Sequence, residues 1–514
     1  MFNFFSAKPD HPLANPNEAK NIAAQLTRAD PRTALGDATA WLESLSNADG
    51  FKLAMLAERI SLIGGAAAPQ ARRLGREFVQ GDTDSRAAQA LWNVELRFWA
   101  LLADCYEKCV ARMHAGGKDV DLPKEILATL FAGALNARAA TQKWNQFYYR
   151  QPPEAFWAMV GGLYREAVAL NVASREVELH PGHGKTTAES EYLKILLFHV
   201  AAMDTLEPIE IELGERLIAH FLRDFNLTRA VRPENVYWID IARPGPPSRL
   251  ARVPEVSDSL YFFNGGKALA GVDDLLATME SSGAVPAHVN LAGQYPSAQV
   301  REVLKHLALC WAPKPPMRVH VRRQANASLA LTHGFDNALQ TIAYALSTSR
   351  TKVGPLETWS ASDVSLGGMA IHGPVGREDW TRIGAIVVTL PEGGSNWLVG
   401  IVRRVSRGPA EFEDPTHSLP PGVENRMVYL GIETVSKNAR AVVADADGLS
   451  IDALILDLPV VGEYARMAVP PNSVESGIGL RFRLDEKVAR LLPRETLESG
   501  PDFLIANFFV QSFA

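Results

Sequence analysis

The sequence has few cysteines, no long apolar run and little net charge, and each of these scarcities excludes a class of protein. Three cysteines in 514 residues are too few for the disulfide framework of a small secreted protein. No stretch approaches the ~18 apolar residues that a membrane-spanning helix needs. A net charge of −6 gives no overall basic balance, so a nucleic-acid polymer is not expected as a partner.

The composition is otherwise that of an ordinary globular protein, with 47% hydrophobic and 21% charged residues. A chain of this length is expected to form roughly two to four domains. The first residues, Met1-Phe-Asn-Phe-Phe5, have neither the charged nor the apolar segment of a signal peptide. We therefore expect a cytoplasmic protein.

Cys105 and Cys109 are four residues apart, a spacing that suits half of a metal site or one face of a helix. Free cysteine is among the most often buried residue types. The pair continues an apolar stripe at helical spacing, formed by Leu91, Val94, Phe98 and Leu102. We therefore predict that both thiols pack in a core, and we expect no metal site.

Residues 1–235 are predicted to form an all-helical domain, because apolar residues recur at helical spacing between short Pro or Gly breaks. The strongest helix begins after Ser85, a typical N-cap, and Gly116-Gly117 would end it. We find no fixed-period repeat in these residues. The other helices are predicted over residues 17–27, 32–45, 51–63, 69–80, 123–149, 153–172, 187–203 and 208–225.

The residues from 236 onward are predicted to form three further parts. Residues 236–312 read as a mixed α/β adaptor, with strands near 236–242 and 260–263 and helices near 272–281 and 298–310. Residues 313–440 follow a stiff proline-rich linker and contain short strands joined by glycine-rich turns, a pattern that favours a β-barrel. Residues 441–514 read as a further β-rich module. The fold class is therefore multidomain α+β.

Two short motifs 40 residues apart suggest a ligand site. Arg318-Val-His-Val-Arg322 reads R-x-x-x-R, and Asp363-Val-Ser365-Leu-Gly367-Gly368 reads D-x-S-x-x-G. An arginine fork meets both acceptors of a guanine edge or pairs with a phosphate. Short polar side chains suit hydrogen bonds to a base edge or a sugar hydroxyl, and glycines allow close approach of the backbone to a flat ligand.

The two motifs, in this order and surrounded by strand-like sequence, resemble the PilZ domain over about residues 313–436. This family is a small β-barrel that binds cyclic di-GMP, so the resemblance implies a receptor, not an enzyme, and implies no cofactor. It implies that Arg318 and Arg322 grip guanines and phosphates, with Arg323 adding a phosphate contact. Beneath the ligand it places Asp363, Ser365, Gly367 and Gly368.

The segment between the two motifs is longer than a compact hairpin of this family needs. Residues 335–349 have apolar residues at helical spacing, namely Leu339, Ile342, Ala343 and Leu346. An inserted helix would account for the length.

The function that these patterns favour is that of a bacterial signalling receptor or adaptor. The barrel would sense cyclic di-GMP, and the helical half would contact a partner protein. One alternative is a scaffold protein whose PilZ-like barrel does not bind the dinucleotide. Another is an enzyme with a site near residues 236–310. His180-Pro-Gly-His-Gly-Lys-Thr186 is not taken as a phosphate-binding loop, because Leu179 stands where the first glycine is needed.

Overall fold

The computed structural model describes residues 9–83, 85–116, 121–182, 184–255, 257–314, 320–346, 355–374, 380–408, 427–473 and 478–513. These residues fall into two compact units, 9–314 and 320–513. The first unit is mainly helical and the second is built from β-strands, so the multidomain α+β fold class is confirmed. None of the helices in the described part of the chain has the length and apolar character needed to cross a membrane.

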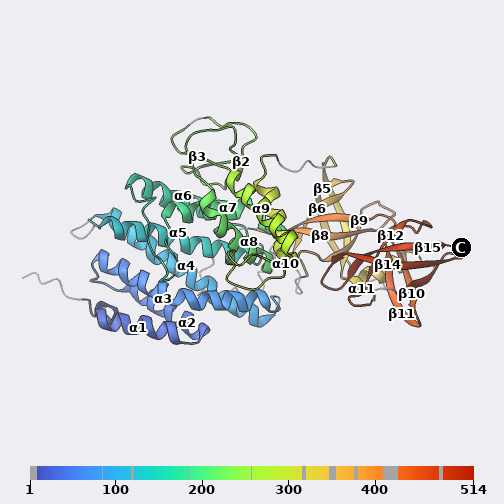
Figure 1. Cartoon of the computed structure of the whole chain (residues 1–514), viewed down its shortest axis with the longest axis horizontal. Coiled ribbons are helices and arrows are strands. Elements are labelled where there is room, and N and C mark those ends of the chain that lie inside the picture. Colours follow the sequence, from blue (N-terminus) through green and yellow to red (C-terminus); the bar gives the residue numbers. More distant parts are fainter. Residues whose placement is uncertain are drawn as a thin grey trace, which may run out of the picture. The chain divides into compact units, whose positions relative to one another are not determined.

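The helical unit is a layered array in which helices close in the sequence pack against one another (Figure 1). For example, α4 packs on α2, α3 and α5, and α5 also packs on α7. The helices are α1 (Pro16–Arg28), α2 (Pro31–Asn47), α3 (Leu53–Gln80), α4 (Arg86–Ala115), α5 (Lys124–Gln146), α6 (Glu154–Ala169), α7 (Ala188–Val200) and α8 (Pro208–Phe221). The short 3₁₀ turns are η1 (Pro12–Ala14), η2 (Met203–Thr205) and η3 (Leu222–Asp224).

The ends of α4 confirm the prediction from its capping residues. The Ser85 hydroxyl accepts a hydrogen bond from the Ala88 backbone N–H at 3.1 Å, which satisfies one of the free donors of the first turn. The helix stops at Gly116, whose φ of +75° is a conformation that glycine adopts without strain. Cys105 and Cys109 are buried in this helix, and burial raises the pKa of each thiol to about 12.

Helix α3 corrects the prediction of two separate helices over 51–63 and 69–80. It runs unbroken through Gly64, Gly65 and Pro69. The glycines are sites of close packing: a Cβ on Gly64 would lie 3.0 Å from Leu102, and one on Gly65 would lie 3.1 Å from the Leu179 carbonyl oxygen. Tertiary packing therefore outweighs their low helix propensity.

Residues 237–311 hold a small antiparallel sheet and two helices that belong to the same unit. The sheet has the order β2-β1-β3, from β1 (Tyr237–Asp240), β2 (Ser248–Arg249) and β3 (Leu260–Phe263). Helix α10 (Ser297–Trp311) packs on α8 and on α9 (Gly266–Ser282). The Tyr237 hydroxyl donates to the Cys310 carbonyl at 2.6 Å and so ties the sheet to α10.

The second unit begins with a closed antiparallel barrel in the order β4-β5-β6-β9-β8-β7, which we call the first barrel. Its strands are β4 (Arg323–His333), β5 (Glu357–Ser365), β6 (Gly368–Pro374), β7 (Ile386–Pro391), β8 (Leu398–Arg407) and β9 (Met427–Ser436). The segment between β4 and β5 contains α11 (Phe335–Leu346), which confirms the predicted inserted helix.

The last part of the chain forms the second barrel, in the order β10-β11-β12-β15-β14-β13. If the strands of each barrel are numbered along the chain, both have the order 1-2-3-6-5-4, so they share one topology. The β-rich module predicted over 441–514 is thus a closed barrel. Its strands are β10 (Arg440–Ala446), β11 (Leu449–Ile455), β12 (Tyr464–Val469), β13 (Leu480–Leu484), β14 (Lys487–Ser499) and β15 (Leu504–Phe513).

A buried apolar cluster joins the two barrels, and we call it the shared core. Alternate residues of β7 and β8 face this cluster. Val387, which lies between Ile386 and Val388 on β7, is buried on the opposite side of the strand. Burial on both faces explains why these strands read as continuous apolar runs. The cluster comprises Phe335, Ala338, Ile342, Ile386, Val388, Val399, Ile401, Val435, Ala439, Leu454, Leu456, Ala468, Phe503 and Ile505.

Two polar contacts accompany the shared core. The Phe335 backbone N–H at the start of α11 donates to Asp502 Oδ2 at 2.7 Å, so the second barrel caps this helix. Arg403 on β8 donates to both carboxylate oxygens of Glu498 on β14, at 2.5 and 2.7 Å, and to Glu433 on β9 at 2.7 Å. Burial alone would lower the pKa of Arg403, but its two carboxylate partners raise it.

Candidate functional site

The described end of the R-x-x-x-R motif, Arg322, meets the D-x-S-x-x-G motif at one end of the first barrel. Arg322 immediately precedes β4, and Asp363 and Ser365 lie on the last residues of β5. Strands β4 and β5 pair with Gln324 opposite Asp363 and Arg323 opposite Val364. The long segment that contains α11 therefore leaves the two motifs on adjacent strands.

Arg322 and Asp363 are in direct contact. Arg322 Nη1 donates to both carboxylate oxygens of Asp363, at 3.0 and 3.1 Å. The side chains are 42% and 28% exposed, so the pair lies at the surface of the barrel, where solvent weakens the attraction. A ligand can reach both groups without the opening of any buried contact.

The turn from Ser365 to Gly368 is held against β9. The Ser365 hydroxyl donates to the Gly368 carbonyl at 3.1 Å, and the Thr434 N–H donates to the Gly367 carbonyl at 3.0 Å. A Cβ on Gly368 would lie 2.1 Å from the Ile432 carbonyl oxygen, so only glycine fits at this position. The absence of a side chain at Gly368 therefore lets the turn lie close against β9.

The structure does not bring the two other predicted arginines, Arg318 and Arg323, to this site. Arg318 lies outside the described residues. Arg323 is exposed at the start of β4, but it pairs with Val364, and alternation directs its side chain to the opposite side of the strand from Gln324 and Asp363. Its predicted phosphate contact remains a prediction.

His320 is a neighbour of the site that the sequence did not single out. Its ring carbon Cδ2 lies 2.9 Å from where a Cβ on Gly367 would stand, so the imidazole lies over the glycine turn. The R-x-x-x-R motif specifies only its two arginines. Because His320 occupies one of the variable positions between them, the motif does not identify it. Beside it, Val321 is 86% exposed and Leu366 on the turn is 68% exposed.

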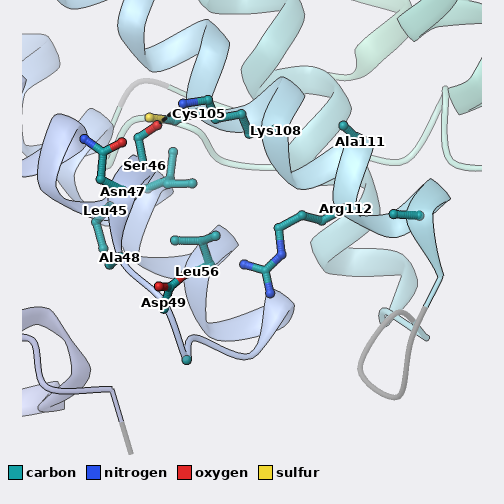
Figure 2. A pocket seen from close by; sticks show the side chains of 13 residues that line it. Leu45, Ser46, Asn47, Ala48, Asp49, Leu56, Cys105, Lys108, Ala111 and Arg112 are labelled. Atoms are coloured by element: carbon teal, nitrogen blue, oxygen red, sulfur yellow. Dashed lines mark hydrogen bonds between the residues drawn. The ribbon is translucent and has the colours of Figure 1, made fainter.

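A pocket of about 580 Å³ lies in the helical unit, between α4 and the segment that joins α2 to α3. Figure 2 shows Lys108 and Arg112 projecting from α4 toward that segment. Lys108 contacts the Ser46 hydroxyl, and Arg112 donates to the Phe51 carbonyl at 3.0 Å. Both cations therefore contact polar groups of the protein, as Arg322 does at the barrel surface.

The other groups considered from the sequence are structural where the chain is described. His180 lies against Trp99, with ring centroids 6.5 Å apart, and its Nε2 lies 3.3 Å from the Asn136 side-chain oxygen, whereas His183 is outside the described residues. Within the described ranges, no three His, Cys, Asp or Glu side chains gather into a group that would hold a metal ion.

Comparison with known families adds a finding about the helical unit. Residues 17–233 match a family described as the N-terminal domain of the cyclic-di-GMP receptor FimW. The matched residues begin within α1 and end beyond η3, so both barrels lie outside the match. No curated protein matches the chain. Over about two fifths of its length, the chain is therefore similar to the N-terminal domain of a receptor for cyclic di-GMP.

Proposed function

We propose that the chain is a cyclic di-GMP receptor of the PilZ type, in which the first barrel binds the dinucleotide. Two independent parts of the chain support this proposal. The helical unit is similar to the N-terminal domain of the cyclic-di-GMP receptor FimW. The first barrel carries the R-x-x-x-R and D-x-S-x-x-G motifs outside the matched residues.

The observation that carries the proposal is the contact between Arg322 and Asp363 on an exposed surface. The pair brings a cation of the first motif and a carboxylate of the second to one solvent-exposed place, as a shared ligand site requires. An exposed ion pair contributes only about 0–1 kcal/mol to stability, so a ligand can replace it at small cost. Arg322 would then turn to a guanine edge or a phosphate of the ligand.

The remaining predicted residues take roles that follow from their places. Arg318 would provide the second guanidinium of the motif, and Arg323 a further cation for a phosphate. Asp363 would accept from the guanine N–H groups, and Ser365 would hold the turn. Gly368 lets the turn approach β9, and Gly367 makes room for the His320 ring, so both glycines would shape the turn beside the ligand.

The proposal includes a signalling role without catalysis. Binding would favour one arrangement of Arg322 and its neighbours, and the ligand would shift the equilibrium toward that arrangement by its higher affinity for it. The helical unit would present a surface to a protein partner. The three cysteines are free thiols, as is usual in a reducing compartment, so the proposed receptor acts in the cytoplasm.

The test is calorimetric titration of cyclic di-GMP into the full, ligand-free chain. We expect saturable binding by the wild type. Each charge-assisted hydrogen bond contributes about 1.5–3 kcal/mol, so Arg322→Ala should weaken binding by roughly 10- to 150-fold. Arg481→Ala, at an exposed position of β13 in the second barrel, is the matched control and should bind as the wild type does.

Absence of binding by a folded, ligand-free wild-type chain would refute the receptor proposal. The first barrel would then be a degenerate module of a scaffold protein. Equal binding by the wild type and Arg322→Ala would show that the dinucleotide binds elsewhere. The helical unit would be the next place to search, beginning with the pocket beside Lys108 and Arg112 (Figure 2).

A further inference from the structure

The first eight helices offer little apolar surface to a protein partner. Among the described residues, the exposed large apolar side chains begin at Val231, beyond α8 and η3. The described parts of α1 to α8 therefore present no exposed apolar patch of the kind that often marks a protein interface. A partner of these helices must be recognised through a pocket or through charged groups.

The pocket between α4 and the segment that joins α2 to α3 has both (Figure 2). Lys108 and Arg112 are four residues apart on α4, so they lie on one face of the helix and line the same pocket. Both side chains are exposed and can be reached by a partner. The volume of about 580 Å³ lies within the range of roughly 300–1,000 Å³ that is usual for ligand pockets.

The protein does not balance the charges of this lysine and arginine. Within the described ranges, neither forms an ion pair with a carboxylate, whereas Arg97 on the same helix pairs with Glu43. Their contacts are with neutral oxygens, the hydroxyl of Ser46 and the carbonyl of Phe51. A neutral oxygen orients a cation but leaves its charge available to an anion, which forms the stronger, charge-assisted hydrogen bond.

An apolar floor accompanies the two cations. Leu56 and Ile60 of α3 and Cys105 of α4 line the pocket and are buried. Among the described lining residues, Asp49 is the single acidic one, and it is exposed on the segment between α2 and α3. An occupant with an anionic group beside an apolar group would match both the cations and the floor.

We propose that this pocket captures an extended acidic segment of a protein partner. A carboxylate of the segment would lie between Lys108 and Arg112, where the guanidinium can donate two parallel hydrogen bonds and the ammonium group supplies a compact charge. A neighbouring apolar side chain of the segment would lie against Leu56 and Ile60. The hydrogen bond to the Phe51 carbonyl already orients the arginine, so binding costs less side-chain entropy.

This inference rests on the partner role in the proposed function and not on the way in which the dinucleotide binds. An acidic segment is favoured over cyclic di-GMP as the occupant, because the described lining residues include no aromatic ring on which a base could stack. The first barrel and the pocket would then have separate tasks, the one to bind the dinucleotide and the other to hold the partner.

The test measures the binding of three fluorescein-labelled peptides to the full chain by fluorescence anisotropy. The probe is Gly-Glu-Leu-Glu-Leu-Gly, and the comparison peptides have glutamine or lysine in place of both glutamates. The glutamate peptide should bind about 5- to 30-fold more tightly than the glutamine peptide, which is the contribution of two partly exposed ion pairs. The lysine peptide should bind more weakly than either.

A charge reversal gives a readout that misfolding cannot imitate. Lys108→Glu combined with Arg112→Glu should invert the order, so that the lysine peptide binds most tightly. Lys20→Glu combined with Arg28→Glu is the matched control and should keep the wild-type order, because both residues are exposed on α1 and do not line the pocket. Ala111→Trp, at an exposed lining position of α4, should fill the pocket and abolish binding of the glutamate peptide.

The outcomes separate this inference from dinucleotide binding. Equal affinities for the three peptides, or the same order of affinities in the wild type and the Lys108/Arg112 reversal, would overturn the inference. Displacement of the glutamate peptide by cyclic di-GMP that persists in Arg322→Ala would also overturn it, because the pocket would then bind the dinucleotide. A wild type that shows the peptide preference but does not bind cyclic di-GMP would refute the receptor proposal and leave the pocket assignment standing.

Discussion

The shared core predicts that the two barrels are stabilised together, and Phe503→Ala tests this directly. Phe503 is 1% exposed and lies in the cluster that contains residues of both barrels. Removal of a buried phenylalanine ring costs about 3–5 kcal/mol, the sum of lost transfer free energy and the cavity left behind. Domains have a total stability of only about 5–15 kcal/mol, so the loss is large.

Hydrogen exchange on the full chain is the appropriate assay, because it reports the protection of each element separately. The amides of β7 and β8 belong to the first barrel, although Phe503 lies in the second. We expect their exchange to accelerate by roughly two to four orders of magnitude, at about 1.4 kcal/mol per factor of ten. The amides of α4 and α5 serve as an internal reference and should not change.

Leu497→Ala provides the control for a substitution in the same region. Leu497 is 47% exposed on β14, so its truncation should change stability by about 0.5 kcal/mol or less. Faster exchange in β11, β12 and β15 with unchanged protection of β7 and β8 would refute the reasoning. The barrels would then be separate folding units that merely touch.

Two further predictions concern Glu95 and Gly368. Burial raises the pKa of Glu95 well above its ordinary value of 4.5, despite the hydrogen bond from Trp99. The folded state therefore keeps a proton that the unfolded state releases above about pH 4.5. The free energy of unfolding consequently falls as the pH rises. The free energy of unfolding of Glu95→Gln should therefore rise relative to that of the wild type by about 1.4 kcal/mol per pH unit, up to the folded-state pKa of Glu95. Urea unfolding of both proteins at pH 5, 6 and 7 measures this difference. Parallel pH profiles would contradict the expectation. Gly368→Ala places a Cβ 2.1 Å from the Ile432 carbonyl oxygen and should lower the stability of the first barrel by about 1–3 kcal/mol. Gly408→Ala is the control and should leave the stability unchanged, because a Cβ there meets no atom within 4 Å. Equal thermal midpoints of the two variants would count against the assigned role of Gly368.

The spacing of apolar residues along the sequence predicted most of the helices and strands. It failed where glycines pack closely inside a helix and where a strand has few apolar residues. Strand β5 has a weak sequence signal, because Glu357–Ser365 is rich in Ser and Thr and has few apolar residues, with only Trp359 and Ala361 buried. The break predicted after Ile63 does not exist, since the glycines there serve close contacts between elements.

The candidate site was predictable only in part. The two motifs are local in sequence, so Arg322 and Asp363 were identified before the structure placed them in contact. His320 stands at a variable position of the first motif, and its approach to Gly367 depends on how the first barrel folds, which no single segment encodes.

The cap on α11 has a consequence for the order in which the protein folds during synthesis. The acceptor for the Phe335 N–H is Asp502, 167 residues further along the chain. At about 5–20 residues per second, a ribosome needs roughly 8–30 s to make the intervening segment. During that interval, α11 lacks its cap, and the shared core lacks Phe503 and Ile505, although its members on β11 and β12 have already been made. The apolar cluster between the two barrels is therefore completed only with the last strand of the chain.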